Sequence, residues 1–166
     1  MTEITIRPSE RSDIDAIYDI YENEVLHGMA TFDEVPPSRE ELLEKRAEVR
    51  RAGFPHLVAE LDGEVIAYSY ISLYRQRSAY SSTVENAIYV HPFHRGTGVG
   101  FKLMTVILQE CTKLGLKNVI AVIGDSENHG SIKLHKKLGF RKVGTMREVG
   151  FKFGLWIDVV LMQKQL

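Results

Sequence analysis

Hydrophobic residues recur along this chain with two different periods. Segments in which they alternate with polar residues, or form short apolar runs, predict strands, whereas a spacing of three to four residues predicts helices. The helices are predicted at residues 14–25, 38–51, 101–114 and 131–138. The strands are predicted at residues 4–6, 57–61, 64–72, 83–90, 118–123, 141–148 and 156–163.

Short-range signals mark where several of these elements begin. Ser9 and Ser12 are candidate N-caps for the first helix. Ser38, followed three residues later by Glu41, is typical of a capping box at the start of the second helix. Asp62-Gly63, placed between two strand patterns, predicts a tight two-residue hairpin.

The order of the predicted elements is β-α-α-β-β-β-α-β-α-β-β. This order is neither a regular βα alternation nor an all-β pattern. It favours an α/β fold of the α+β type, in which a mixed, mostly antiparallel central sheet carries helices on both faces. We expect one domain over residues 1–166, because no linker, repeat or low-complexity segment divides the chain.

Composition narrows the classes of protein that the chain can represent. The net charge is −1, from 21 basic and 22 acidic residues, which argues against a nucleic-acid partner. Cys111 is the only cysteine, so the chain forms no internal disulfide and a cytoplasmic location is expected. We expect no membrane partner, because the N-terminus lacks a signal-peptide pattern and no apolar run approaches the ~20 residues of a membrane span. No His/Cys cluster has metal-ligand spacing, so no metal is expected.

A glycine-rich turn lies between a predicted strand and a predicted helix, and it is the first chemical signal. Its residues are Arg95, Gly96, Thr97, Gly98, Val99 and Gly100. Such a turn either joins two elements or presents backbone N–H groups and a helix N-terminus to a phosphate. A dinucleotide site is disfavoured, because the third glycine of its motif would fall at Phe101. A P-loop is disfavoured because no Gly-Lys-Ser/Thr follows.

The form Arg-x-x-Gly-x-Gly, together with Asn128, Ser131, His135 and the pair Gly139-Phe140 further on, resembles the GNAT acyltransferase superfamily. The chain also resembles a narrower group, the phosphinothricin N-acetyltransferase family, which includes acetyltransferases for methionine sulfone and methionine sulfoximine. The most specific match is residues 150–158, Gly-Phe-Lys-Phe-Gly-Leu-Trp-Ile-Asp.

The resemblance implies the GNAT fold, acetyl-CoA as co-substrate, a small-molecule amine as acceptor and a homodimer. It also implies that the strand at residues 83–90 splays at a bulge beside its neighbour. That strand would then offer backbone groups to the pantetheine arm and to the oxyanion of the reaction. The cofactor-binding residues expected from it are the glycine-turn residues 95–100 together with Ile88, Tyr89, Val90, Asn128 and Ser131. Asn128 also reads as an N-cap for the helix that follows.

Two residues are expected to act in catalysis. Glu85 stands in an otherwise apolar and small strand segment, where a carboxylate is unusual unless it is paired or functional, although a solvent-facing strand position would also explain it. The resemblance implies that Glu85 is the general base that deprotonates the amine. His135 would protonate the leaving thiolate or hold the substrate; alternatively, it is a helix histidine bonded to a backbone carbonyl.

The acceptor-binding residues are also carried over from the resemblance. They are Phe32, Tyr74, Arg75, Gln76, Asn86 and Ala87. Arg75 would bind the carboxylate of the acceptor. The sequence departs from the family at two of these positions, because the family usually has Trp in place of Tyr74 and Pro or Ala in place of Gln76. Lys152 and Trp156 are expected to shape the pocket or a subunit contact.

The leading hypothesis is therefore an N-acetyltransferase that uses acetyl-CoA to acetylate the α-amine of a small amino acid or analogue. Two alternatives remain open at this stage. The same scaffold could acetylate a protein N-terminus or a lysine, or it could be a CoA-binding module that has lost catalysis.

Overall fold

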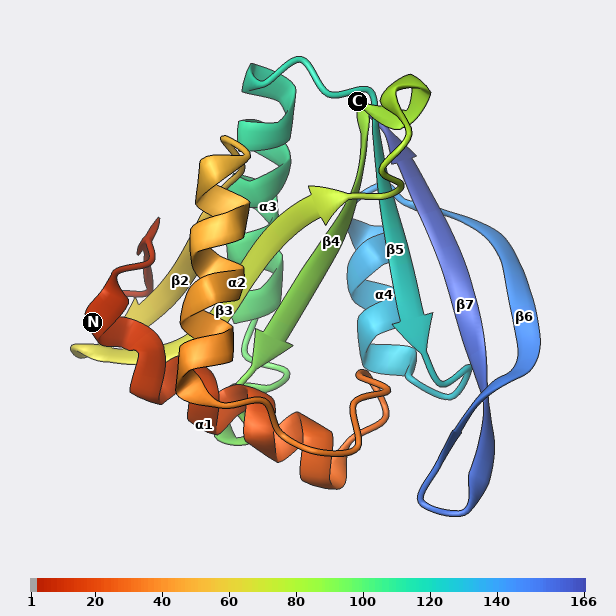
Figure 1. Cartoon of the computed structure of the whole chain (residues 1–166), viewed down its shortest axis with the longest axis horizontal. Coiled ribbons are helices and arrows are strands. Elements are labelled where there is room, and N and C mark those ends of the chain that lie inside the picture. Colours follow the sequence, from red (N-terminus) through yellow and green to blue (C-terminus); the bar gives the residue numbers. More distant parts are fainter. Residues whose placement is uncertain (1–2) are drawn as a thin grey trace.

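A seven-stranded sheet organises the part of the chain that the computed structural model describes, residues 3–166 (Figure 1). Across the sheet the strands follow the order β1-β2-β3-β4-β5-β7-β6. Their bounds are β1 Thr5–Pro8, β2 His56–Leu61, β3 Glu64–Leu73, β4 Thr83–Val90, β5 Asn118–Gly124, β6 Arg141–Lys152 and β7 Leu155–Gln165. Within these described strands, β4 and β5 are the one parallel pair. The mixed, mostly antiparallel sheet predicted from the sequence is confirmed.

Helices cover both faces of the sheet, as predicted (Figure 1). The bounds are α1 Ile14–His27, α2 Arg39–Arg51, α3 Val99–Lys113 and α4 His129–Lys137, with short 3₁₀ helices at Arg11–Asp13, Ser78–Tyr80 and Pro92–His94. Side chains alternate between the faces along each strand. Val58 of β2 therefore packs with α1 and its neighbour Leu57 joins the core under α3.

The starts of the two N-terminal helices contrast. The capping box of α2 is confirmed, because Ser38 Oγ accepts the N–H of Glu41 at 3.1 Å and the Glu41 carboxylate accepts the N–H of Ser38 at 2.7 Å. The expectation that Ser9 or Ser12 caps α1 is wrong. The chain enters α1 through a 3₁₀ turn in which Asp13 accepts the N–H of Glu10 at 2.7 Å, and Ser9 is buried.

The C-terminal hairpin is longer than the hydrophobic pattern predicts. β6 extends to Lys152 and turns into β7 at Phe153-Gly154, where both φ angles are positive. The register shifts between Met146 and Gly150, so the alternation is interrupted there. The Asp158 carboxylate secures this irregular segment by accepting the N–H of Glu148 at 2.8 Å. The short hairpin at Asp62-Gly63 forms as predicted, with φ of 53° and 81°.

β4 and β5 separate part-way along their length. Their described pairing runs from Thr83 to Glu85 on β4 and ends at Glu85 opposite Ile120. Beyond that point β4 stays paired with β3 and β5 stays paired with β7. The expected splay is therefore present, but not the expected bulge in β4, which keeps an unbroken register with β3. The separation comes from loss of pairing on one edge.

Candidate active site

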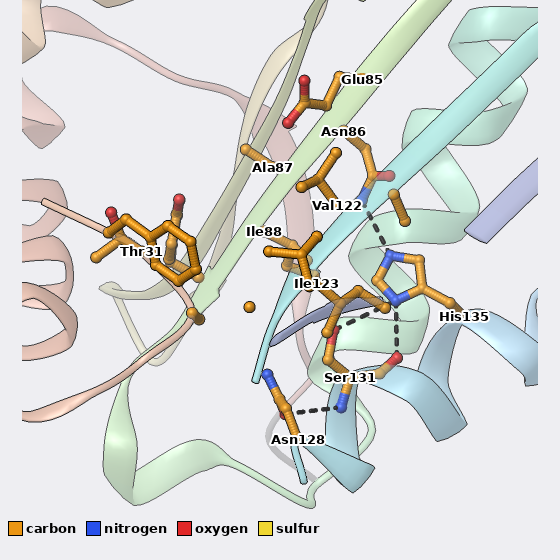
Figure 2. A pocket seen from close by; sticks show the side chains of 16 residues that line it. Thr31, Glu85, Asn86, Ala87, Ile88, Val122, Ile123, Asn128, Ser131 and His135 are labelled. Carbon is orange, nitrogen blue, oxygen red and sulfur yellow. Dashed lines mark hydrogen bonds between the residues drawn. The ribbon is translucent and has the colours of Figure 1, made fainter. Parts of the chain in front are cut away.

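A cleft of about 250 Å³ occupies the space between the separated strands (Figure 2). It is lined by residues of β4, β5, β7 and α4, by the N-cap of α4 and by the loop after α1. The predicted site residues that it brings together are Phe32, Glu85, Asn86, Ala87, Ile88, Tyr89, Asn128, Ser131 and His135. Ala30, Thr31, Ala121, Val122, Ile123, Gly124 and Val159 complete the lining.

Side chains from both faces of the sheet line the cleft, because consecutive residues of β4 take part and their side chains alternate between the faces. Tyr89 packs on the α1 side, against Tyr21 and Tyr68. Glu85 and Ala87 share this side, since they lie four and two residues before Tyr89. Asn86 and Ile88 face the opposite side, toward α3 and α4 (Figure 2). A molecule on the α1 side and another on the α4 side can therefore meet between the strands.

Glu85 lies at the point where the two strands part, with its carboxylate at the cleft (Figure 2). Burial raises the pKa of this carboxyl, and the nearby charges of Arg75 and Lys45 oppose the rise. A raised pKa makes a carboxylate a stronger base while it is still ionised near neutral pH. The alternative explanation, that Glu85 is a strand residue facing solvent, does not hold, because Glu85 is half-buried and lines the cleft.

His135 is held from both ring nitrogens. Its Nδ1 lies 2.7 Å from the backbone carbonyl of Ser131, and its Nε2 lies 3.1 Å from Nδ2 of Asn86 (Figure 2). A carbonyl only accepts, so Nδ1 carries the proton and Nε2 accepts from the amide. Burial also lowers the pKa of His135, which favours the neutral ring. These contacts support a ring that orients neighbouring groups; action as an acid remains a prediction.

The glycine turn has the geometry of an anion-binding site. Gly96 and Gly98 have φ of 75° and 87°, and Gly98 is the N-cap of α3. A Cβ at either glycine would meet no described atom within 4 Å, so the turn is open to a ligand. The first N–H groups of α3 lack helical partners, so they are available to an anion. Arg95 instead reaches α1, where Nη2 donates to the Glu24 carboxylate at 2.9 Å.

The residues predicted for the acceptor do not all meet at the cleft. Tyr74, Arg75 and Gln76 lie in the loop after β3, outside its lining. The Arg75 guanidinium stacks over the Tyr74 ring at 4.1 Å and donates to the Tyr74 carbonyl at 2.9 Å. Asn86 lies on the α4 side, where it binds His135, and not on the side of Glu85. Val90 ends β4 beyond the cleft.

Sequence reasoning missed one residue that supports the site, Glu24, and expected the second, Lys152, to shape the pocket or a subunit contact. Glu24 is buried at the end of α1, where it binds both Arg95 and the N–H of Ala30. Lys152 is buried on β6 and binds the loop after α1. Each is a charged residue among apolar positions, and a charged residue in such a pattern is the feature of the sequence that could have indicated a supporting role.

The family comparison decides what kind of protein carries this cleft. The model of the acetyltransferase (GNAT) family matches residues 14–140. The chain belongs to the GNAT family. The GNAT fold and the enzyme class predicted from the sequence, an N-acetyltransferase, are confirmed.

Similar proteins point to a narrower group of GNAT enzymes. Phosphinothricin N-acetyltransferase of Alcaligenes faecalis is 44% identical over 98% of this chain and 82% of its own length. The L-methionine sulfoximine/L-methionine sulfone acetyltransferase of Salmonella typhimurium is 37% identical over 98% and 95%. The crystal structure of a phosphinothricin acetyltransferase from Sinorhizobium meliloti in complex with acetyl-CoA is 40% identical, with a TM-score of 0.95 over 98% of this chain and 88% of that one. The expected resemblance to this group is confirmed.

Two further observations concern other site types. Over residues 3–166, His, Cys, Asp and Glu side chains form no group of three or more that could hold a metal ion. None of the helices in the same range is long and apolar enough to cross a membrane.

Proposed function

We propose that this GNAT protein transfers the acetyl group of acetyl-CoA to the α-amine of a small amino acid or analogue, of the phosphinothricin, methionine sulfone or methionine sulfoximine type. The observation that carries the proposal is the cleft through the sheet, with Glu85 on one side and the elements of a phosphate and amide site on the other. Relatives with these activities match the chain over nearly its whole length.

The α3–α4 side fits acetyl-CoA. The open turn at Gly96 and Gly98 suits the pyrophosphate, because N–H groups and a helix dipole favour an anion there. Asn128 accepts the N–H of Ser131 through Oδ1 at 3.2 Å, so it caps α4 while its amide NH₂ stays available to a ligand. The edge of β4 beyond Glu85 has no β5 partner and can pair with the amides of the pantetheine arm.

Glu85 would serve as the base of the reaction. An α-amine with a pKa of roughly 8 is mostly protonated at neutral pH and must lose a proton before it attacks. Glu85 faces the α1 side, from which the acceptor would enter, and its raised pKa suits it to take that proton directly or through water. Backbone N–H groups of β4 would then bind the carbonyl oxygen as its negative charge grows.

The contacts of Ser131 and His135 support direct attack by the amine. The ring proton of His135 is directed at the carbonyl of Ser131, so Nδ1 is unable to accept a proton from the Ser131 hydroxyl. Ser131 is therefore not activated as a nucleophile, and an acyl-enzyme on it is not supported. Neutral His135 and Asn86 instead form a fixed polar pair beside the reacting groups.

The size of the cleft favours a small acceptor. Its volume, about 250 Å³, lies just below the ~300–1,000 Å³ that small-molecule sites usually span. An amino acid of the proposed type fills such a space, whereas a peptide requires a longer groove. We also propose a cytoplasmic location, which the single buried cysteine, Cys111, supports.

We further propose a homodimer that covers the tip of the β6–β7 hairpin. The tip exposes apolar residues, namely Val149, Phe151, Phe153, Leu155 and Trp156. Contiguous exposed apolar patches mark interaction sites in soluble proteins. A second copy of this chain presents the same patch and would bury it across a two-fold axis.

A thiol-release assay tests the proposed activity. Purified protein is mixed with acetyl-CoA and a panel that holds phosphinothricin, methionine sulfone, methionine sulfoximine, plain methionine and a peptide with a free N-terminus. We expect CoA release with at least one amino-acid analogue and none with the peptide. Release with the peptide alone would support the protein-acetylating alternative, and acetyl-CoA binding without turnover would support the binding module.

A further inference from the structure

Lys152 is a charged side chain in the core, with only 1% of its surface exposed. Its Nζ donates to the backbone carbonyl of Gly28 at 2.7 Å and to that of Thr31 at 2.8 Å, with the carbonyl of Glu24 at 3.5 Å. A buried ammonium needs partners for its three N–H groups. These partners all belong to the end of α1 and the loop after it, more than 120 residues away in sequence.

This loop forms one wall of the cleft through Ala30, Thr31 and Phe32 (Figure 2). It has no regular secondary structure, so its buried carbonyls depend on outside donors. Lys152 supplies those donors. The carbonyl of Thr31 and the backbone nitrogen of Phe32 belong to the same peptide unit. The hydrogen bond from Lys152 Nζ to this carbonyl therefore also positions the backbone of Phe32.

Gly150 provides a second contact between the same strand and the same loop. It is two residues before Lys152 on β6. A Cβ at Gly150 would overlap the ring of Phe32, so the glycine leaves the space that this ring occupies. The φ of Gly150 is not in the left-handed region, so the backbone angle does not require a glycine. The glycine is required because the Phe32 ring occupies the space that a Cβ would fill.

We propose that Lys152 is a positioning residue that, together with Gly150, holds the loop at residues 28–32 against the cleft and thereby sets which acceptors the enzyme binds. This inference rests on the proposed function. Lys152 does not line the cleft and acts through the loop. The glycine turn and α4 do not contact Lys152, and its two shorter hydrogen bonds go to the acceptor-side loop, so we expect the larger effect on the acceptor.

The test compares Lys152→Met with Lys142→Met, an exposed lysine on the same strand. Met keeps the length of the side chain but leaves the loop carbonyls without donors. We expect the acceptor KM of Lys152→Met to rise about tenfold or more, because unpaired buried carbonyls shift the loop. The kcat and the Kd for acetyl-CoA should stay within about twofold of wild type, as should every constant of Lys142→Met.

Hydrogen exchange provides a second measurement that needs no acceptor. Amides at residues 30–32 should exchange faster in Lys152→Met, while those of α3 stay unchanged. If Lys152→Met does not fold, Gly150→Ala decides the matter, since its methyl group displaces Phe32 and should raise the acceptor KM with the acetyl-CoA Kd unchanged.

An acceptor KM within about twofold of wild type in the folded variant, with unchanged exchange at residues 30–32, would overturn the proposal. A kcat loss with unchanged KM would overturn it too, because the residue would then act on chemistry. A wild-type protein that acetylates no amino acid refutes the proposed function instead, and the exchange measurement still decides whether Lys152 holds the loop.

Discussion

Glu85 is the residue on which the proposed chemistry depends most. Glu85→Gln keeps the shape of the side chain and removes its basicity. We expect kcat to fall by about 10²–10⁴-fold, the usual contribution of a general base. Steady-state kinetics with the best acceptor of the panel measure kcat. The matched control is Glu64→Gln, at an exposed position on β3. An unchanged kcat would remove Glu85 from the mechanism.

The pH profile of the reaction belongs to the same residue. Burial raises the pKa of Glu85, and only the ionised carboxylate accepts a proton. As pH falls through this raised pKa, kcat/KM for the acceptor should fall, at a pH above the ordinary value of about 4.3 for Glu. Residual activity of Glu85→Gln should lack this acid limb. An identical limb in the variant would assign the titration to another group.

His56 gives a prediction about stability instead of activity. It is buried, and its pKa falls to about 4, chiefly through burial and further through Arg46 and Arg50. In the unfolded chain a histidine takes up its proton near pH 6.5. Between these values the unfolded state binds more protons, so stability should fall as pH drops from about 6.5 to about 4, by about 3 kcal/mol for this group.

Denaturant unfolding at a series of pH values checks this expectation. His56→Phe should lose much of the slope between pH 6.5 and 4, because the ring no longer titrates. His129→Phe, at an exposed position, should keep the slope. Equal slopes in wild type and His56→Phe would contradict the assignment to His56.

At the scale of elements, the turn before α3 is expected to be sensitive to substitution. Gly98 has a φ of 87°, which an L side chain rarely adopts. Gly98→Ala should strain the turn, move the first N–H groups of α3 and raise the Kd for acetyl-CoA by about tenfold, given a strain of ~1–2 kcal/mol. Isothermal titration calorimetry measures the Kd.

The matched control lies at the other end of the same helix. Gly115 has a similar φ of 73° with open space around it, and it lies beyond the C-terminal end of α3. Gly115→Ala carries comparable strain and should leave the Kd for acetyl-CoA unchanged. Equal weakening in both variants would mean that general destabilisation, and not the turn, explains the effect.

Much of the element structure could be predicted from local patterns, because local interactions determine it. β4 spans Thr83–Val90, the range that the pattern predicts, and the capping box starts α2 where Ser38 and Glu41 place it. The extension of β6 could not be predicted in this way. Its register shift near Glu148 depends on Asp158, whose carboxylate comes from the neighbouring strand.

At the scale of the whole molecule, the homodimer proposal predicts a change in mass. Trp156 is 65% exposed at the hairpin tip. Trp156→Glu should place a charge in a buried apolar interface and shift the protein from dimer to monomer. Light scattering after size-exclusion chromatography measures the mass, and Leu114→Glu, at the exposed C-cap of α3, is the control. A monomeric wild type would refute the dimer.

The site as a whole was only partly predictable, because several of its contacts join residues that are far apart in the sequence. Motif matches found Glu85, Asn128 and His135 because each sits in a recognisable local sequence. They did not find the pairing of His135 with Asn86 or the hold of Lys152 on Thr31, which join residues 49 and 121 positions apart. Nor did they show that Arg95 binds Glu24 at 2.9 Å. Such contacts follow from the strand order.

The separation of β4 and β5 also has a mechanical consequence. The described sheet has two parts, β1–β4 and β5–β7. They are joined by the short β4–β5 pairing, a seam that ends at Glu85. A rotation of one part against the other about this seam would widen the gap between β4 and β5 most at its far end, near Gly124, and least at the seam. Glu85 therefore lies at the closed end of the gap, so a change in the angle between the two parts of the sheet would move it least relative to β5 and would move Gly124 most.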